Sequence, residues 1–235
     1  MRSFCIWGVL GVLLSGLAGC QSWQVPSEEL VMYGGQRKTP EQHAADTKFY
    51  QQMVQQFATP QKASNVCAER GWRSFYAGEL TSAMKSFNQA WLLDQGNPQA
   101  YWGFGAVSLK QGDYRKGLDM LAKAYNLDPN NPRIVSELAY AYALNGRGYL
   151  SYKNEDDAMY LRLAEEYFRK ASRLDPTYPL LYSQWAEARY YERDWAGAWE
   201  RVMKAGALGG EGTVHPELVE KLSEKMPCPY APQGK

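Results

Sequence analysis

The residues best suited to chemistry are few in this chain of 235 residues. Its two histidines, His43 and His215, stand in polar segments and offer no metal-ligand spacing. We find no Ser/His/Asp or Cys/His arrangement and no glycine-rich phosphate loop. Glu69, Glu165 and Glu166 are spaced like carboxylates on solvated helix faces. The sequence therefore predicts a protein that is not an enzyme and that holds neither a metal nor a cofactor.

Cys20 is the residue whose position indicates a covalent reaction. It follows a short basic start and an apolar stretch from Phe4 to Leu14, which is too short to span a bilayer but typical of a signal peptide. Small residues complete the motif Leu17-Ala18-Gly19-Cys20, which resembles the lipobox of bacterial lipoproteins. The resemblance implies a thioether-linked diacylglycerol on Cys20, cleavage before it, and an acyl chain such as palmitate on the new amino terminus. A conventional secretory signal that ends at a coincidental cysteine is the alternative.

The residue after the cysteine bears on which membrane the lipid would enter. Gln21 stands where, by the sorting rule of enteric-type bacteria, an aspartate indicates retention in the inner membrane. The resemblance therefore implies the outer membrane, at its periplasmic face. Two or more acyl chains anchor a protein stably, whereas one holds it only marginally.

The balance of basic and acidic residues argues against nucleic acid and anionic lipid as partners. Removal of residues 1–19 leaves 216 residues with 25 basic and 25 acidic side chains. A neutral mature chain has no global attraction to nucleic acid or to anionic lipid. We therefore expect contact with the membrane through the lipid on Cys20 and no binding of nucleic acid.

A repeat with a period of 34 residues organises the chain. Its copies share small residues, a large apolar residue and an ending that contains aspartate and proline. Two copies are Ala83-x-x-x-Phe87-x-x-Ala90-x-x-x-Asp94-Gln95-x-Asn97-Pro98 and Gly117-x-x-x-Leu121-x-x-Ala124-x-x-x-Asp128-Pro129-x-Asn131-Pro132. A further copy, 164–179, follows after 13 inserted residues. Over about residues 60–208 the pattern resembles the tetratricopeptide repeat, which implies an all-α solenoid of about four helix pairs.

Elementary packing explains the pattern without the family name. Glycine or alanine recurs where two helices cross, as at Gly105, because a larger side chain would hold the axes apart. Asn97-Pro98 and Asn131-Pro132 supply an N-cap followed by a proline, whose missing N–H costs nothing in the first turn of a helix. Each helix pair leaves an apolar face bare, so the stacking of neighbouring pairs stabilises the array.

The remaining segments complete the expected organisation, with a loop from Gly206 to Val214 before the last helix. It consists of a signal peptide at 1–19, a flexible tether at 20–38, a capping helix at 39–58, four repeats at 59–208 with an insertion at about 147–159, and a C-terminal helix and tail at 209–235.

The first helix of each pair lines a concave groove in tetratricopeptide arrays. Helical spacing maps this face to Trp72, Tyr76, Trp102, Ala106, Lys110, Ser136, Tyr140, Glu187, Tyr190 and Tyr191. Large rings with a polar tip are typical of interfaces, although each of them could instead pack between helices. The family's clamp for a terminal carboxylate is absent, since its places hold Ala68, Trp72, Gly103 and Ala106. The expected ligand is therefore an extended, partly apolar peptide or a partner helix.

Two functions follow from the resemblance. The first is a scaffold, anchored by lipid to the outer membrane, that binds an envelope protein or peptide in the groove. The second is a dedicated, pilotin-like accessory subunit of a pilus, secretion or adhesion system. The shared architecture is an analogy and does not decide between them.

Two further cysteines, Cys67 and Cys228, are expected in a compartment that favours disulfides. A bond between them requires the C-terminal segment to fold back along the array, beside or inside the groove. The alternative is a buried thiol at Cys67 and, at Cys228, a thiol that is free or pairs with a partner.

Overall fold

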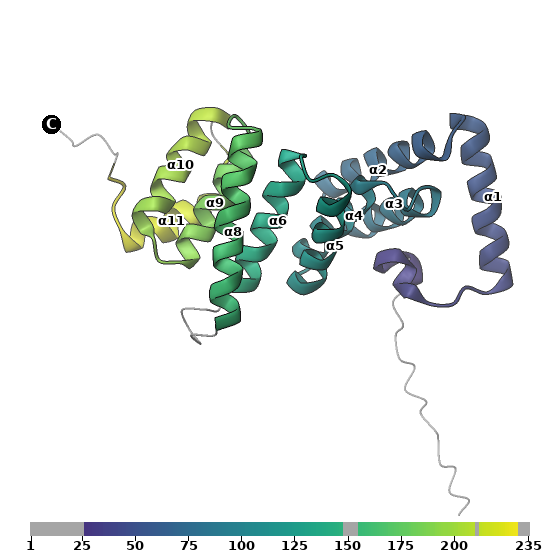
Figure 1. Cartoon of the computed structure of the whole chain (residues 1–235), viewed down its shortest axis with the longest axis horizontal. Coiled ribbons are helices and arrows are strands. Elements are labelled where there is room, and N and C mark those ends of the chain that lie inside the picture. Colours follow the sequence, from purple (N-terminus) through teal and green to yellow (C-terminus); the bar gives the residue numbers. More distant parts are fainter. Residues whose placement is uncertain (1–25, 148–154, 210–211, 230–235) are drawn as a thin grey trace, which may run out of the picture.

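The computed structural model describes residues 26–147, 155–209 and 212–229. The expected signal peptide, Cys20 and the centre of the insertion lie outside these residues. Within them the chain forms helices and no strands, which confirms the expected all-α solenoid (Figure 1). The α-helices are α1 (Pro40–Phe57), α2 (Pro60–Tyr76), α3 (Leu80–Leu93), α4 (Pro98–Lys110), α5 (Tyr114–Leu127), α6 (Pro132–Gly146), α8 (Glu155–Leu174), α9 (Pro179–Tyr191), α10 (Trp195–Gly209) and α11 (Pro216–Lys225).

The helices begin where the sequence supplies caps. The hydroxyl of Thr39 accepts a hydrogen bond from the backbone N–H of Gln42, whose side chain accepts one from the N–H of Thr39, before Pro40 opens α1. Asn97 and Asn131 cap α4 and α6 as expected, each ahead of a proline.

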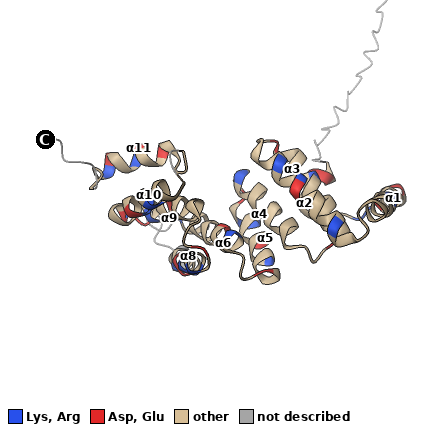
Figure 2. Ribbon diagram, turned by 90° about the horizontal axis from the view of Figure 1, so that it is seen from above, with Lys and Arg blue, Asp and Glu red and all other residues tan. Residues whose placement is uncertain are grey.

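Helices pack as antiparallel pairs, and successive pairs stack along the array (Figure 1). The pairs are α2 with α3, α4 with α5, α6 with α8, and α9 with α10. Contacts also join α2 to α4, α4 to α6, and α6 to α9, so these first helices form one continuous face. α1 packs on the amino end of the array and α11 on α10 at the carboxyl end. Figure 2 shows basic and acidic residues interspersed along the helices.

Close helix crossings depend on glycine. Phe87 is fully buried, and a Cβ added to Gly71 or to Gly103 would lie within 2.6 Å or 2.3 Å of its ring. A Cβ on Gly105 would lie 2.5 Å from Leu121 Cγ and 3.2 Å from the carbonyl oxygen of Gly117. α4 and α5 therefore approach backbone to backbone, as the small-residue pattern predicted.

The chain before α1 is folded where the sequence predicted a flexible tether. Two short 3-10 turns, η1 (Ser27–Glu29) and η2 (Val31–Gly35), lie against α3. We call residues 26–35 the strap. Its Val31 and Met32 pack on the core cluster of α2 and α3, so apolar burial holds a segment that has no periodicity of its own.

Asn88 of α3 joins the strap to the repeats. It is fully buried; its amide nitrogen donates to the carbonyl oxygens of Glu28 (2.9 Å) and Leu30 (2.8 Å), and its oxygen accepts from the N–H of Tyr33 (3.3 Å). Met32 and Tyr33 have φ of 49° and 55°, a left-handed conformation that side chains rarely adopt. Tertiary contacts therefore hold the strap in a strained turn.

The C-terminal segment differs from two expectations. α10 continues to Gly209, through the start of the loop expected from Gly206. After α10 the chain does not return to the first repeat: Leu218 and Leu222 of α11 pack with Trp199, whose indole N–H donates to the carbonyl oxygen of Met226 (3.0 Å).

This placement leaves the cysteines apart. Cys67 is a free, buried thiol among the residues of α2 and α3, whereas Cys228 is a free thiol beside α10 and α11. The disulfide is therefore not formed in this structure, because α11 packs on the last helix pair and Cys67 lies in the first.

In the part of the chain that the structure describes, no helix combines the length and apolar character needed to cross a membrane.

Candidate functional site

Three adjoining hollows line the face formed by α2, α4, α6 and α9. They measure about 620, 490 and 260 Å3, and we call them together the inner groove. All but one of the groove residues expected from helical spacing line one of the hollows: Trp72, Tyr76, Trp102, Ala106, Lys110, Tyr140, Glu187, Tyr190 and Tyr191. Ser136 was wrongly placed on this surface, because it is fully buried between helices. The degree of exposure of the other residues, however, separates them into two kinds.

The amino-terminal hollow is aromatic. The rings of Trp72 and Trp102 lie 4.4 Å apart, and Tyr76 stacks on Trp72 at 6.0 Å. Tyr76 is 75% exposed, whereas Trp102 is 7% exposed and belongs mainly to the core. Ala106, 5% exposed, is also a packing residue. Trp72 and Tyr76 thus form the accessible surface, and Trp102 forms the floor beneath them.

Polar atoms in this hollow are incompletely paired. The indole N–H of Trp72 donates to Gln99 Oε1 (3.0 Å). The buried indole N–H of Trp102 has no hydrogen-bond acceptor among the described residues. A buried donor without an acceptor costs about 1–3 kcal/mol, so this position is unusual for ordinary core packing.

A chain of neutral donors orients two carboxylates in the central hollow. The Ser136 hydroxyl donates to Gln184 Oε1 (2.7 Å), and Gln184 Nε2 donates to Glu137 Oε1 (3.0 Å). Glu187 accepts hydrogen bonds from the hydroxyls of Tyr140 (2.8 Å) and Tyr191. Burial raises the pKa of both tyrosines, which keeps them neutral donors. Helical spacing placed Tyr140 and Glu187 in the groove but missed Glu137 and Gln184, which pair across α6 and α9.

Burial also changes the acidity of Glu137. Desolvation raises the pKa of its carboxyl from 4.5 to about 7, against the opposing effects of the Gln184 hydrogen bond and the Lys110 charge. The folded state thus binds this proton more tightly than the unfolded state does, so Glu137 lowers stability as pH rises from about 4.5 to 7.

We expect Glu137→Gln to remove this loss, because the amide keeps the shape and an acceptor for Gln184 but carries no charge. Urea unfolding measured between pH 4.5 and 7.5 should show the variant losing less stability than the wild type across that window. Glu69→Gln, an exposed change on α2, serves as the control and should follow the wild-type curve. Parallel curves for the wild type and Glu137→Gln would contradict the assignment.

The start of the C-terminal segment forms one wall of the groove. Gly212, Thr213 and His215 line the central hollow, while Glu217 and Lys221 of α11 line the smallest one with Tyr140 and Tyr190. Spacing within the repeats gave no signal for this wall, because it comes from residues after the last repeat.

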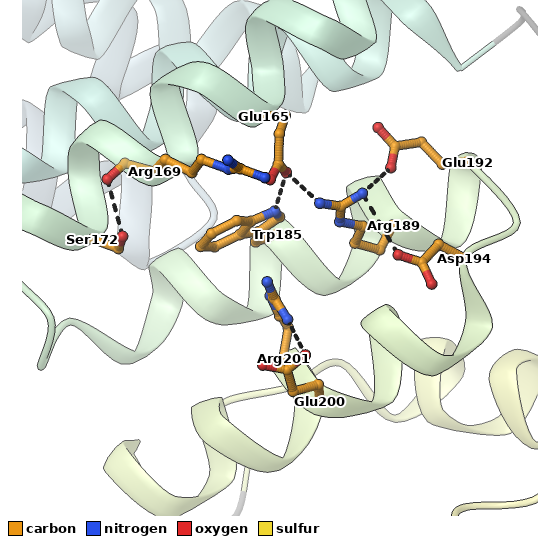
Figure 3. A network of polar contacts seen from close by, with 9 residues as sticks. All are labelled: Glu165, Arg169, Ser172, Trp185, Arg189, Glu192, Asp194, Glu200 and Arg201. Carbon is orange, nitrogen blue, oxygen red and sulfur yellow. Dashed lines mark hydrogen bonds and ion pairs between the residues drawn. The ribbon is translucent and has the colours of Figure 1, made fainter.

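Another hollow, of about 600 Å3, lies at α8 and α9 and is dominated by ion pairs (Figure 3). Glu165 accepts from Arg169 (2.7 Å), from Arg189 (2.8 Å) and from the indole N–H of Trp185 (2.8 Å). Arg189 also pairs with Glu192 (2.8 Å). The prediction that Glu165 is solvated was wrong. Its side chain is 19% exposed, because α9 brings Arg189 and Trp185 onto it. These contacts join α8 to α9, and we interpret the network as structural.

Comparisons with known proteins agree with the architecture. The fold is a tetratricopeptide-repeat α-solenoid. TTC0263, a thermophilic TPR protein of Thermus thermophilus, has a solved structure that is 21% identical in sequence, matches over 69% of this chain and 80% of its own, and superimposes with a TM-score of 0.59. A MamA RS-1 ArsTM double mutant is 19% identical over 73% of this chain and 96% of its own, with a TM-score of 0.44. No protein-family model and no curated protein matches the sequence.

Proposed function

We propose that this protein is a non-enzymatic scaffold that binds a segment of an envelope protein in the inner groove. The observation that carries the proposal is the accessible ring of Tyr76, 75% exposed and stacked on Trp72, at one end of a groove whose centre holds oriented polar groups. Rings of this kind bury a large area at low entropic cost when a partner covers them. The groove offers apolar surface, donors and acceptors, which are the elements of peptide recognition.

A lipid on Cys20 would hold this scaffold at the periplasmic face of the outer membrane. The proposal rests on the motif Leu17-Ala18-Gly19-Cys20 behind an apolar stretch. We expect Cys20→Ser to abolish recovery of the protein with the membrane and to remove labelled palmitate, because the thioether cannot form. Cys228→Ser is the matched control and should remain with the membrane. Retention of Cys20→Ser in the outer-membrane fraction with unchanged gel mobility would rule out the anchor.

Photocrosslinking in intact cells tests the groove itself. A photoreactive residue at Tyr76 should capture a defined envelope protein, whereas the same residue at Met203, exposed on α10 outside the three hollows, should not. Equal capture from both positions would argue against binding in the groove. The captured partner also separates the two candidate roles: several unrelated partners indicate a general adaptor, and one fixed component of a pilus, secretion or adhesion system indicates a pilotin-like subunit.

A further inference from the structure

The two carboxyl groups of the central hollow, those of Glu137 and Glu187, have no cationic partner among the described residues. Their hydrogen bonds come from neutral groups, the amide of Gln184 and the phenols of Tyr140 and Tyr191. These donors fix the direction of each carboxyl group but supply no positive charge.

The hollow at α8 and α9 shows how a partly buried carboxylate is paired with cations elsewhere in the same fold. There the partly buried carboxylate of Glu165 pairs with the guanidinium groups of Arg169 and Arg189. A desolvated carboxylate is costly unless a cation pairs with it, and α8 and α9 supply that cation locally. In the inner groove the position opposite the carboxylates is open.

The cations nearest the groove do not fill that position. Lys110 is exposed at the end of α4 and lowers the pKa of Glu137 from a distance. Arg147 is engaged by Tyr114: its guanidinium lies 4.3 Å from the ring and donates to the hydroxyl (3.1 Å). His215 lines the same hollow from the loop before α11. Lys221 lines the adjoining hollow with Glu187 but pairs with Glu217 (2.5 Å). The groove thus retains two oriented carboxylates with room for an incoming cation.

The chemistry of the site favours an organic cation over a metal ion. No group of three or more His, Cys, Asp or Glu side chains suited to a metal occurs among the residues that the structure describes. Two carboxylates flanked by phenol rings match a guanidinium or ammonium group, which pairs with oxygen and also packs on aromatic faces.

The aromatic hollow supplies an independent second contact. Tyr76 and Trp72 present an accessible apolar surface, and the 93% buried indole of Trp102 beneath them carries the N–H that lacks an acceptor. An apolar side chain would cover the accessible rings of Tyr76 and Trp72.

We infer that the groove selects a peptide segment with a lysine or arginine that pairs with Glu137 and Glu187, a few residues away from an apolar side chain that packs on Trp72 and Tyr76. This inference rests on the proposed function. The rings lie on α2 and the carboxylates on α6 and α9. An extended peptide advances about 3.3 Å per residue, so a peptide that reaches both contacts carries its basic and apolar residues several positions apart.

A display library of random twelve-residue peptides tests the inference without knowledge of the natural partner. The full chain, purified in mild detergent, is the target, and the same chain with Tyr76→Ala is the counter-selection that identifies groove-dependent binders. We expect these binders to share a lysine or arginine at a constant spacing from an apolar residue. Groove-dependent binders that lack a basic residue, or that carry an acidic one there, would overturn the inference while the proposed function stands. An absence of groove-dependent binders would overturn both.

A double-mutant cycle on the best peptide then locates the charge contact. A lysine of the peptide is exchanged for norleucine, which removes the charge and keeps most of the length. An arginine of the peptide is first exchanged for lysine, which keeps the charge, and that lysine is then exchanged for norleucine. We expect Glu137→Gln and the norleucine peptide each to weaken binding at least tenfold, and their combination to weaken it little further. Glu187→Gln provides a second variant if Glu137→Gln does not fold, and Glu69→Gln should change nothing. Additive losses would show that the lysine binds elsewhere and would overturn the inference.

Discussion

Gly105→Leu is expected to lower the free energy of unfolding by about 3 kcal/mol, because its side chain has no space where α4 crosses α5. A Cβ at this position already lies 2.5 Å from Leu121 Cγ and 3.2 Å from the backbone oxygen of Gly117. The Leu121 side chain could move, but the backbone of α5 could not move without opening the second repeat. For a chain of this size the melting temperature should fall by roughly 6–12 °C.

The matched control is the same substitution at Gly206, a glycine of α10 whose Cβ would meet nothing within 4 Å. Gly206→Leu should be neutral or should stabilise by up to about 1 kcal/mol, since leucine favours the helix over glycine. Thermal unfolding followed by circular dichroism compares the two. Similar melting temperatures for both variants would show that the crossing at Gly105 tolerates a larger separation.

Asn88→Leu is expected to release the strap while the repeats stay folded. Leucine branches at the same atom as asparagine, so α3 keeps a side chain of similar shape. The carbonyl oxygen of Glu28 loses its bond to Asn88, and the Leu30 carbonyl oxygen and the Tyr33 N–H keep only their bond to each other (3.0 Å). The three bonds to Asn88 contribute roughly 1.5–4.5 kcal/mol in total. The left-handed conformations of Met32 and Tyr33 cost a comparable amount, about 1–2 kcal/mol each. The hydrogen bonds therefore decide whether the strap stays bound.

Hydrogen exchange measures this release directly. Amide protection at Leu30–Tyr33 should fall by at least tenfold in Asn88→Leu, while protection in α4 and α6 stays near the wild-type level. Gln89→Leu changes the next residue of α3, which bonds to Arg70 and not to the strap, and should preserve the protection. Undiminished protection in Asn88→Leu would mean that the apolar contacts of Val31 and Met32 suffice.

The fold was predictable because its signal recurs. Small residues at helix crossings, such as Gly105, recur in every repeat, and asparagine caps such as Asn97 recur in two of them, so each copy supports the interpretation of the others. The strap had no such support: its apolar residues follow no helical or strand period, and Asn88 lies 55 to 60 residues away along the chain.

The site was predictable to the level of the helix face but not of the single residue. Helical spacing places Trp102 on the inner face, yet neighbouring rings bury it, and the sizes of neighbours on other helices are not visible in one helix's pattern. Glu137 lies beside the predicted face and enters the groove because Gln184 of α9 reaches it. Likewise, Glu165 looked solvated until Arg189 was placed next to it.

The strap affects how far from a lipid anchor on Cys20 the folded protein would reach. With a lipid on Cys20 and the strap free, the linker between the membrane and the folded protein would run from Cys20 to Thr39, which is 19 residues along the chain. With the strap bound, the linker would end at Pro26, six residues from Cys20. These lengths span at most about 65 Å and 20 Å. Because effective concentration falls roughly as the −3/2 power of linker length, the bound strap would raise the local concentration of groove near the bilayer about fivefold. Asn88 would then set the radius within which the protein meets its partner, without any contact with that partner.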